Sequence, residues 1–271
     1  MQIQHFIVLS MILDSDSFRE LLNGVNEKSN EELYNGDDKY VDNSLESYGI
    51  TVTYHDKTHK KKVKLLINPD KLLIGDDSDS NSISKWLSKL EKRINDYFDL
   101  KYTLNDFNLK RMGIITNINV HERSKAATYL KILQKLGKVK GYSPSKHYSL
   151  DNDISFNLTG NSNGIDFMIY DLEKLLKSQQ NTEEKRKELK SITEKSQGIL
   201  RAELWFTSSK SVQNFTTETI ASEQIAELLK NSEEIFFTTV MRIIPVGDFY
   251  KKDKAIEVIQ KKLRTELCDE K

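Results

Sequence analysis

The sequence of 271 residues has little of what several common protein classes require. Its single cysteine, Cys268, cannot form an internal disulfide, and we expect a reducing, cytoplasmic location. No stretch is long and apolar enough to predict a membrane helix. Residues 1–10 lack the basic start and the small-residue cleavage site of a signal peptide, and they predict a strand. We therefore expect a protein without a membrane partner.

The motifs of the common small-molecule enzymes are also missing. The chain contains no phosphate-binding Walker loop, no dinucleotide-binding fingerprint, no zinc-ligand spacing and no nucleophile elbow. It also lacks a His-hydrophobic-His metal motif, since His55 and His59 lie four residues apart in a polar segment. These enzyme classes therefore have no support in the sequence.

Net charge is absent as well, but the charges are unevenly distributed. The formal net charge is zero, which argues against a simple nucleic-acid binder. Residues 1–50 hold ten acidic and three basic side chains, a net charge of −7, whereas residues 101–150 hold ten basic and two acidic ones, a net charge of +8. A local field of that size attracts phosphates. The alternative, that these lysines are only solvated surface, stays open.

Strand and helix periods alternate along the chain in a regular order. From Gly49 onwards the pattern strand–strand–helix–strand occurs twice. This order predicts an α+β fold, with a central, mostly antiparallel sheet and helices packed on it. The expected strands of the sheet are residues 109–119, 154–159, 165–170 and 199–206, and the expected helices are residues 123–136 and 172–195.

We expect two parts in the chain. Residues 1–207 would form the α+β domain, in which residues 23–48 are an acidic loop or insertion. Residues 208–271 would form a helical extension that includes a helix at residues 252–267. We also expect a basic hairpin turn at residues 56–62. Residues 235–244 are expected to form a strand or a helical turn.

Two segments separated by a charged helix contain the most informative pattern. Residues 154–171, ISFNLTGNSNGIDFMIYD, predict a hairpin with an Asn-Ser-Asn-Gly turn. Residues 198–206, GILRAELWF, predict a strand in which Arg201, Glu203 and Trp205 point to one face. A tyrosine and several carboxylates therefore lie in one strand–helix–strand unit, where convergence on one sheet face is possible.

Short motifs in these segments resemble those of rolling-circle replication initiators from plasmids and phages of low-GC Gram-positive bacteria. The similar stretches are residues 158–162 (LTGNS), 169–172 (IYDL) and 200–204 (LRAEL). Residues 66–73, 110–119 and 247–259 resemble further segments of the same family, in the same order. The chain departs from the family's pattern at Gly113, where an aspartate is usual, and at Leu172, where a lysine is usual.

The resemblance implies a fold, an activity and the residues that perform it. The implied fold is a central antiparallel sheet of the split βαβ (ferredoxin-like) type, which agrees with the order of elements. Tyr170 would attack a DNA phosphodiester, and Glu203 would hold a divalent metal, Mg²⁺ or Mn²⁺, or transfer a proton. Asp171 and Asp166 would be further metal ligands. The implied partners are DNA, as an origin hairpin or a single strand, host replication proteins and a second copy of the chain. The side chains expected to contact DNA are Lys110, Arg111, Lys138, Lys140, Tyr142, Lys146, Tyr148 and Arg201.

Plainer interpretations of the same residues stay open. A strand tyrosine such as Tyr170 usually packs in a core, and Glu203 beside Arg201 would form a surface ion pair. Trp86 and Trp205 are expected in the core. The alternative functions are a non-catalytic or truncated DNA-binding relative of the initiators, or a protein-interaction module of a mobile element.

Overall fold

A computed structural model describes residues 3–28, 39–57, 60–72, 83–135, 139–144 and 155–244. The strands are β1 (Ile3–Leu13), β2 (Lys39–Asp42), β3 (Ile50–Lys57), β4 (Lys60–Ile67), β5 (Asn108–Asn119), β6 (Tyr142–Pro144), β7 (Ser155–Gly160), β8 (Ile165–Asp171) and β9 (Ile199–Phe206). The helices are α1 (Ser15–Lys28), α2 (Pro69–Leu72), α3 (Ile83–Tyr97), α4 (Arg123–Gln134), α5 (Leu172–Ser178), α6 (Glu183–Lys195), α7 (Ser209–Gln213), α8 (Ala221–Lys230) and α9 (Ser232–Ile243).

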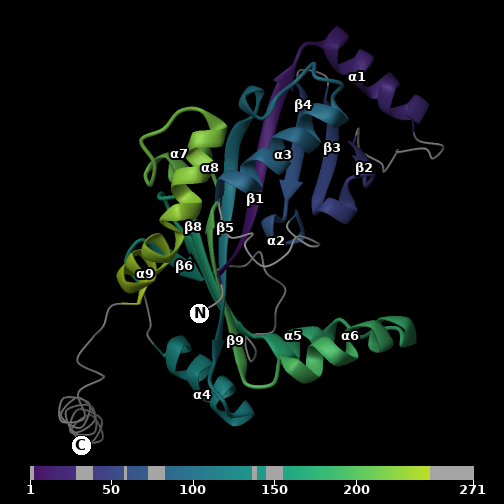
Figure 1. The fold of residues 1–271 in the computed structure, drawn as a ribbon. Helices are drawn as coiled ribbons and strands as arrows, with labels where there is room; N and C mark the ends of the chain where they lie inside the picture. Colours follow the sequence, from purple (N-terminus) through teal and green to yellow (C-terminus); the bar gives the residue numbers. More distant parts are fainter. Residues whose placement is uncertain are drawn as a thin grey trace, which may run out of the picture.

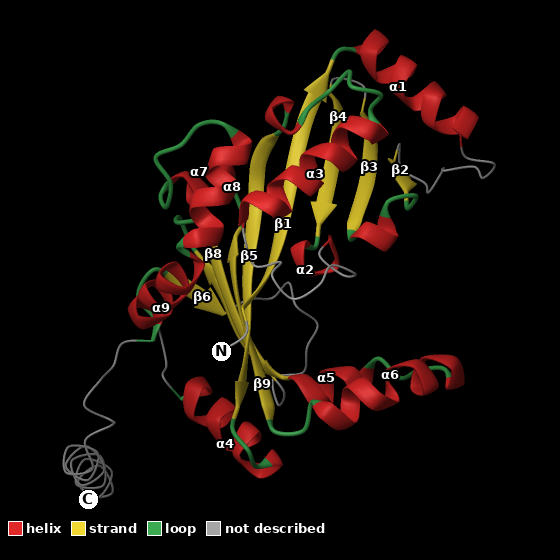
Figure 2. Cartoon of the chain, in the orientation of Figure 1, coloured by secondary structure: helices red, strands yellow, loops and turns green. Residues whose placement is uncertain are grey.

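The described strands form one sheet in the order β2-β3-β4-β1-β5-β9-β8-β7-β6 (Figure 1). Every neighbouring pair in it is antiparallel. Helices pack on the sheet, with α1, α3, α7 and α8 lying over the same face (Figure 2). The predicted α+β class and the mostly antiparallel sheet are confirmed, and the four expected strands correspond to β5, β7, β8 and β9.

The predicted split βαβ unit is formed by β4, α3 and β5. Strand β1 lies between β4 and β5 and is antiparallel to both, so β4 and β5 run parallel to each other. Helix α3 makes the connection, and its apolar stripe of Trp86, Leu90 and Ile94 is buried. The N-terminal strand is therefore held on both sides by segments that come later in the chain.

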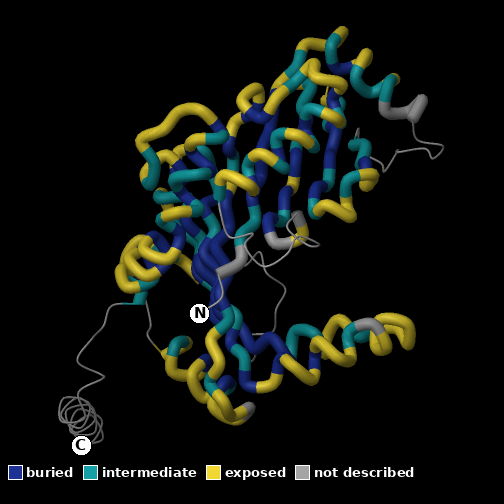
Figure 3. Tube along the Cα trace, viewed as in Figure 1, coloured by how far each residue is buried: buried dark blue, intermediate teal, exposed yellow. Residues whose placement is uncertain are grey.

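Alternation along the strands divides the side chains between two faces of the sheet. The first face carries Ile7, Met112 and Leu204 and is the wall of the main hydrophobic core. Apolar residues of α1, α3, α4, α7, α8 and α9 pack against it, so the strand segments beneath these helices are buried (Figure 3). The opposite, second face carries Phe6 and Trp205.

A smaller apolar cluster lies on the second face. Met168 and Tyr170 of β8 pack there with Leu172 of α5. Helix α5 begins where the Asp171 carboxylate accepts a hydrogen bond from the Lys174 backbone N–H at 3.1 Å. This helix contacts β8 and β9, and therefore covers one end of the second face.

Strands extend into two segments that were expected to be loops. Residues 60–62, expected in a turn, belong to β4, because β3 and β4 pair up to Lys57 and Lys60. Residues 39–42, within the expected acidic loop, form β2 and pair with β3. Both segments alternate with the pleat, and that pairing outweighs their polar composition.

The helical segments also differ in detail. The helix expected at residues 172–195 is two helices, because Thr182 caps α6 by accepting a hydrogen bond from the Lys185 backbone N–H at 3.3 Å. Helix α9 replaces the strand or turn expected at residues 235–244, and its Phe236 is buried in the main core. The helix expected at residues 252–267 lies outside the described residues. No helix in the described ranges is both long and apolar enough to cross a bilayer.

The burial of His5 makes the stability of the fold depend on pH. His5 pairs with Ile114 and lies on the core side of β1, where burial lowers the pKa of its imidazole to about 4. In the unfolded chain this group binds a proton near pH 6.5. The unfolded state therefore takes up the proton first, and the free energy of unfolding decreases as the pH falls from about 6.5 towards 4, by up to about 3 kcal/mol.

Urea unfolding at several pH values between 7.5 and 4.5 measures this dependence. His5→Gln removes the titrating group and keeps a polar side chain, so its free energy of unfolding should change less over that range than that of the wild type. Equal pH dependence of the two proteins would contradict the assignment to His5.

Candidate functional site

Tyr170 and Glu203, predicted from the sequence to work together, are in direct contact. The Tyr170 hydroxyl donates a hydrogen bond to Glu203 Oε1 at 2.5 Å. Trp205 Nε1 donates to the other carboxylate oxygen, Oε2, at 2.9 Å. Tyr170 is 4% exposed and Glu203 8% exposed, so both groups are buried. Each oxygen of this buried carboxylate therefore has a donor, which offsets the loss of its hydration.

The surroundings of Tyr170 raise the pKa of its phenol. Burial raises the pKa of the Tyr170 phenol well above its usual range, the Glu203 charge raises it further, and Arg201 opposes them. Arg201 lies opposite Tyr170 in the strand pairing, and its Nε donates to Asn117 Oδ1 at 2.9 Å. The Tyr170 phenol therefore stays protonated, with the Glu203 carboxylate in position to accept its proton.

The other two predicted carboxylates do not join this pair. Asp171 is used as the cap of α5. Asp166 shares the second face with Tyr170 but lies four residues away along β8, about 13 Å at the usual rise of a strand. Among the described residues, no three His, Cys, Asp or Glu side chains lie close enough to hold a metal ion. The expectation of a Mg²⁺ or Mn²⁺ ion held by Glu203, Asp171 and Asp166 stays a prediction.

Gly113, where the initiator family usually has an aspartate, lies beneath the ring of Trp205. The two residues pair across β5 and β9. A Cβ atom at Gly113 would lie 2.8–2.9 Å from three carbons of the six-membered ring, closer than atoms in contact approach. The absence of a side chain at Gly113 therefore allows the indole to lie flat against the strand. Phe6 of β1 lies on the other side of Gly113, with its ring centroid 6.1 Å from that of Trp205.

A group of cations occupies the second face from β2 to β5. This cationic patch consists of Lys39, Lys60, Lys62, Lys64 and Arg111, together with Lys110, which lies at the bulge of β5 and whose charge acts on Lys62. Burial lowers the pKa of Lys64, and the charges of Arg111, Lys62 and Lys39 lower it further. Burial likewise lowers the pKa of Lys62, with added repulsion from Lys110 and Lys60. The nearest charges to these two lysines thus have the same sign.

Acidic partners for the cationic patch are absent from the described part of the chain. None of its members forms an ion pair with a described residue. His55, which lies among them, has its pKa lowered by burial and then by four surrounding lysines. On the same face Ile12, Leu66 and Arg111 are exposed, whereas Val8 and Ser10 of β1 are buried. Within the described residues, the patch is a concentrated positive field without a neutralising carboxylate.

The predicted DNA contacts are brought together only in part. Lys110 and Arg111 belong to the cationic patch, and Arg201 is on the same face. Lys140 is exposed, but it precedes β6 at the far edge of the sheet. Tyr142 packs against the main core, and its hydroxyl accepts a hydrogen bond from Asn163 Nδ2 at 3.0 Å. The remaining predicted contacts, Lys138, Lys146 and Tyr148, lie outside the described residues.

Most of the cationic patch was missed in the sequence. The signal that could have found it is the alternation of Lys60, Lys62 and Lys64, which places all three on one strand face. Interpreting residues 56–62 as a turn concealed this alternation. Trp205, expected in the core, is half-buried on the second face, whereas Trp86 is in the core as expected, with 3% of its surface exposed.

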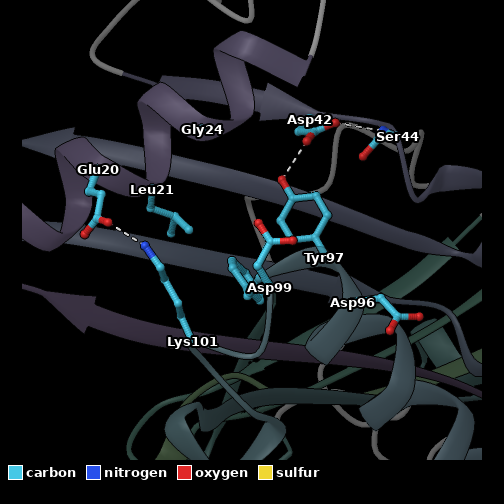
Figure 4. A pocket seen from close by; sticks show the side chains of 10 residues that line it. Glu20, Leu21, Gly24, Asp42, Ser44, Asp96, Tyr97, Asp99 and Lys101 are labelled. Atoms are coloured by element: carbon cyan, nitrogen blue, oxygen red, sulfur yellow. Dashed lines mark hydrogen bonds and ion pairs between the residues drawn. The ribbon is translucent and has the colours of Figure 1, made fainter.

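A cavity of about 290 Å³ lies between α1 and the end of α3 (Figure 4). Tyr97 donates a hydrogen bond to Asp42 at its rim, at 2.6 Å, and Lys101 pairs with Glu20. Asp96 and Asp99 also line it, so its charge is mainly negative. A cavity of this charge is unsuited to phosphate and is separate from the cationic patch.

Comparisons with known proteins give limited information. No protein-family model matches the chain, and no curated protein matches it. Among solved structures, the chain is similar to a rolling circle replication initiator protein from Geobacillus stearothermophilus, with a TM-score of 0.39 and 11% sequence identity. The similarity covers 89% of this chain and 85% of that one. A likeness at this TM-score and identity establishes neither family membership nor activity.

The contact between Gly113 and Trp205 predicts that adding one methyl group at position 113 destabilises the fold. Gly113→Ala places a Cβ against the indole and should lower the free energy of unfolding by about 1–3 kcal/mol, because the ring or the strand must move. Gly24→Ala in α1 is the matched control, since its Cβ would meet nothing within 4 Å. That variant should be unchanged or more stable by up to about 1 kcal/mol.

Chemical denaturation of both variants provides the measurement. In a Trp205→Ala background the cost of Gly113→Ala should disappear, because the colliding ring is gone. A cost that persists there would show that some other neighbour limits the size of residue 113.

Proposed function

We propose that the chain binds single-stranded or hairpin DNA on its second face, as a protein of the replication-initiator kind. The observation that carries the proposal is the cationic patch, whose members repel one another and have no anionic partner in the described ranges. Like charges at this density destabilise the folded state, and a polyanion relieves that repulsion. The resemblance of the sequence motifs to replication initiators favours DNA among the polyanions.

The surroundings of the patch favour an unpaired strand over a duplex. Surfaces that bind single strands combine cations for the backbone with aromatic rings for the bases. Here Phe6 and Trp205 lie on the same face as the patch, directly beside Arg111 along the central strands. Beyond these rings the face continues to Glu203 and Tyr170. A strand that follows the face would therefore pass from the cations to the rings and then to the tyrosine.

Neutralising three cations tests the electrostatic part of the proposal. The variant Lys62→Gln, Lys64→Gln, Arg111→Gln should bind a single-stranded oligonucleotide more weakly. The slope of log affinity against log salt should decrease in magnitude by about 2, since each phosphate contact on a single strand contributes about 0.7. Fluorescence anisotropy of a labelled oligonucleotide at several salt concentrations gives both quantities.

The matched control carries the same charge change elsewhere. Lys185→Gln, Lys187→Gln, Lys190→Gln alters three exposed lysines of α6 and should keep the wild-type slope. The test variant should be at least as stable as the wild type, because it removes mutual repulsion, so weaker binding would not reflect unfolding. Equal loss of affinity in test and control variants would mean that the patch is not the binding surface.

A second candidate function is strand cleavage through Tyr170. The observation that favours it is the 2.5 Å hydrogen bond from the phenol to Glu203. In this reaction Tyr170 Oη forms a bond to a DNA phosphorus, its proton passes to Glu203, and the bond from phosphorus to the leaving strand oxygen breaks as that oxygen gains a proton. The phenol is 4% exposed, so α5 and its neighbours must first move to admit the phosphate.

Incubation with supercoiled DNA and Mg²⁺ or Mn²⁺, followed by denaturation, tests for a covalent protein–DNA adduct. Tyr170→Phe should abolish the adduct while leaving oligonucleotide affinity within a few-fold of the wild type. Glu203→Gln should reduce the yield of adduct, and Tyr142→Phe, on the other face, should not. An adduct formed by Tyr170→Phe would exclude Tyr170 as nucleophile. If the wild type binds DNA and forms no adduct, the non-catalytic interpretation holds.

A further inference from the structure

The chain has two tryptophans, and the structure gives them different environments. Trp86 is in the main core. Trp205 is half-buried on the second face, outside that core, although tryptophan is a costly residue to leave partly in water. Its Nε1 is hydrogen-bonded to Glu203, which fixes the orientation of the ring. A large aromatic ring that is oriented and partly exposed is a feature of binding surfaces.

The geometry around Gly113 shows how the ring is oriented. A Cβ atom placed ideally on Gly113 would lie 2.8, 2.9 and 2.9 Å from three carbons of the six-membered ring of Trp205. Because these three distances are nearly equal, the ring presents its face, and not its edge, to the Cα of Gly113. The opposite face of the indole is therefore turned away from the sheet.

Phe6 enlarges the aromatic surface. Its ring is inclined by 29° to that of Trp205, with the centroids 6.1 Å apart, so the two rings are nearly parallel and offset. Phe6 is also half-buried. We call Phe6 and Trp205 together the aromatic ledge, which spans β1, β5 and β9 with Gly113 in the middle strand.

The ledge lies between the two parts of the second face already described. Arg111 of the cationic patch is two residues from Gly113 along β5, about 6.6 Å at the rise of a strand. That spacing is similar to the separation of a phosphate from its own base in a nucleotide. On the other side, Glu203 joins Trp205 directly to Tyr170. A base on the ledge would thus place its flanking phosphates towards Arg111 and towards Tyr170.

We propose that the aromatic ledge of Phe6 and Trp205 is a stacking site for one unpaired base of the bound strand. The site rests on the proposed function, and it specifies the ligand as a single-stranded nucleotide recognised through its base face. Stacking on aromatic side chains tolerates every base, because each has a π-face. The ledge therefore selects unpaired over paired nucleic acid, and it does not read sequence.

Tryptophan fluorescence tests the site directly, because Trp86 is buried and Trp205 is the one expected to meet the base. Titration with an oligothymidylate should quench the emission of the wild-type protein. The variant Trp205→Phe has Trp86 as its only tryptophan. It should bind the oligothymidylate without a decrease in tryptophan emission. An oligonucleotide of the same length that lacks its bases, and a blunt duplex, should leave the wild-type emission unchanged.

Affinity provides the second measurement. Trp205→Leu should weaken oligothymidylate binding by about fivefold or more, the lower end of the usual effect of losing one stacked base, and Phe6→Leu should weaken it less. The salt slope should stay at the wild-type value in both, since no cation is removed. The Trp86 emission and the thermal unfolding of each variant report whether the fold is kept.

The results of these experiments distinguish failure of the stacking site from failure of DNA binding as a whole. Salt-dependent binding of oligothymidylate without quenching, and with full affinity in Trp205→Leu, would overturn the ledge and leave DNA binding on the cationic patch intact. Absence of any salt-dependent binding by the wild type would overturn both. Quenching that is lost in Trp205→Phe, together with a salt slope reduced by loss of Lys62, Lys64 and Arg111, would support both.

Discussion

The pairing of β1 with β4 on one side and β5 on the other is the constraint on which the rest of the structure depends. Ile7 pairs with Ile67 and Met112 on the first face, and Val8 pairs with Leu66 and Arg111 on the second. A shift by one residue would exchange the two faces, burying cations and exposing the core. The main core therefore fixes the register of β1, and that register places the cations together on the opposite side.

The two faces have opposite energetic roles. The first face supplies the hydrophobic burial that stabilises the fold. The second face holds arrangements that a sequence selected for stability alone would avoid: neighbouring lysines with no ion pair to a described carboxylate, a half-buried tryptophan and a buried carboxylate. Departures of this kind concentrate at functional sites. Among the described helices, α5 packs on the second face, over the end that contains Tyr170.

Much of this could be predicted from local patterns. Alternation in β9 correctly placed Arg201, Glu203 and Trp205 on one face, because a strand's period depends only on its own residues. The meeting of Lys64 with Arg111 depends on β1 lying between their strands, a non-local pairing that no local pattern contains. The position of Trp205 depends on the missing side chain of Gly113 across the sheet. In the sequence, Gly113 is a departure from the family's usual aspartate. In the structure, its missing side chain leaves the space that the Trp205 ring occupies.

The ends of the sheet have a consequence for self-association. In the described part of the chain the two outermost strands are short: β2 has four residues and β6 has three. Pro144 of β6 has no backbone N–H to offer, and Lys39 of β2 adds charge to the opposite edge. Short strands with proline or lysine discourage edge-to-edge hydrogen bonding between copies. Two molecules joined along these edges would share only a few ladder bonds, so a wide sheet of this kind remains protected against growing into a fibre.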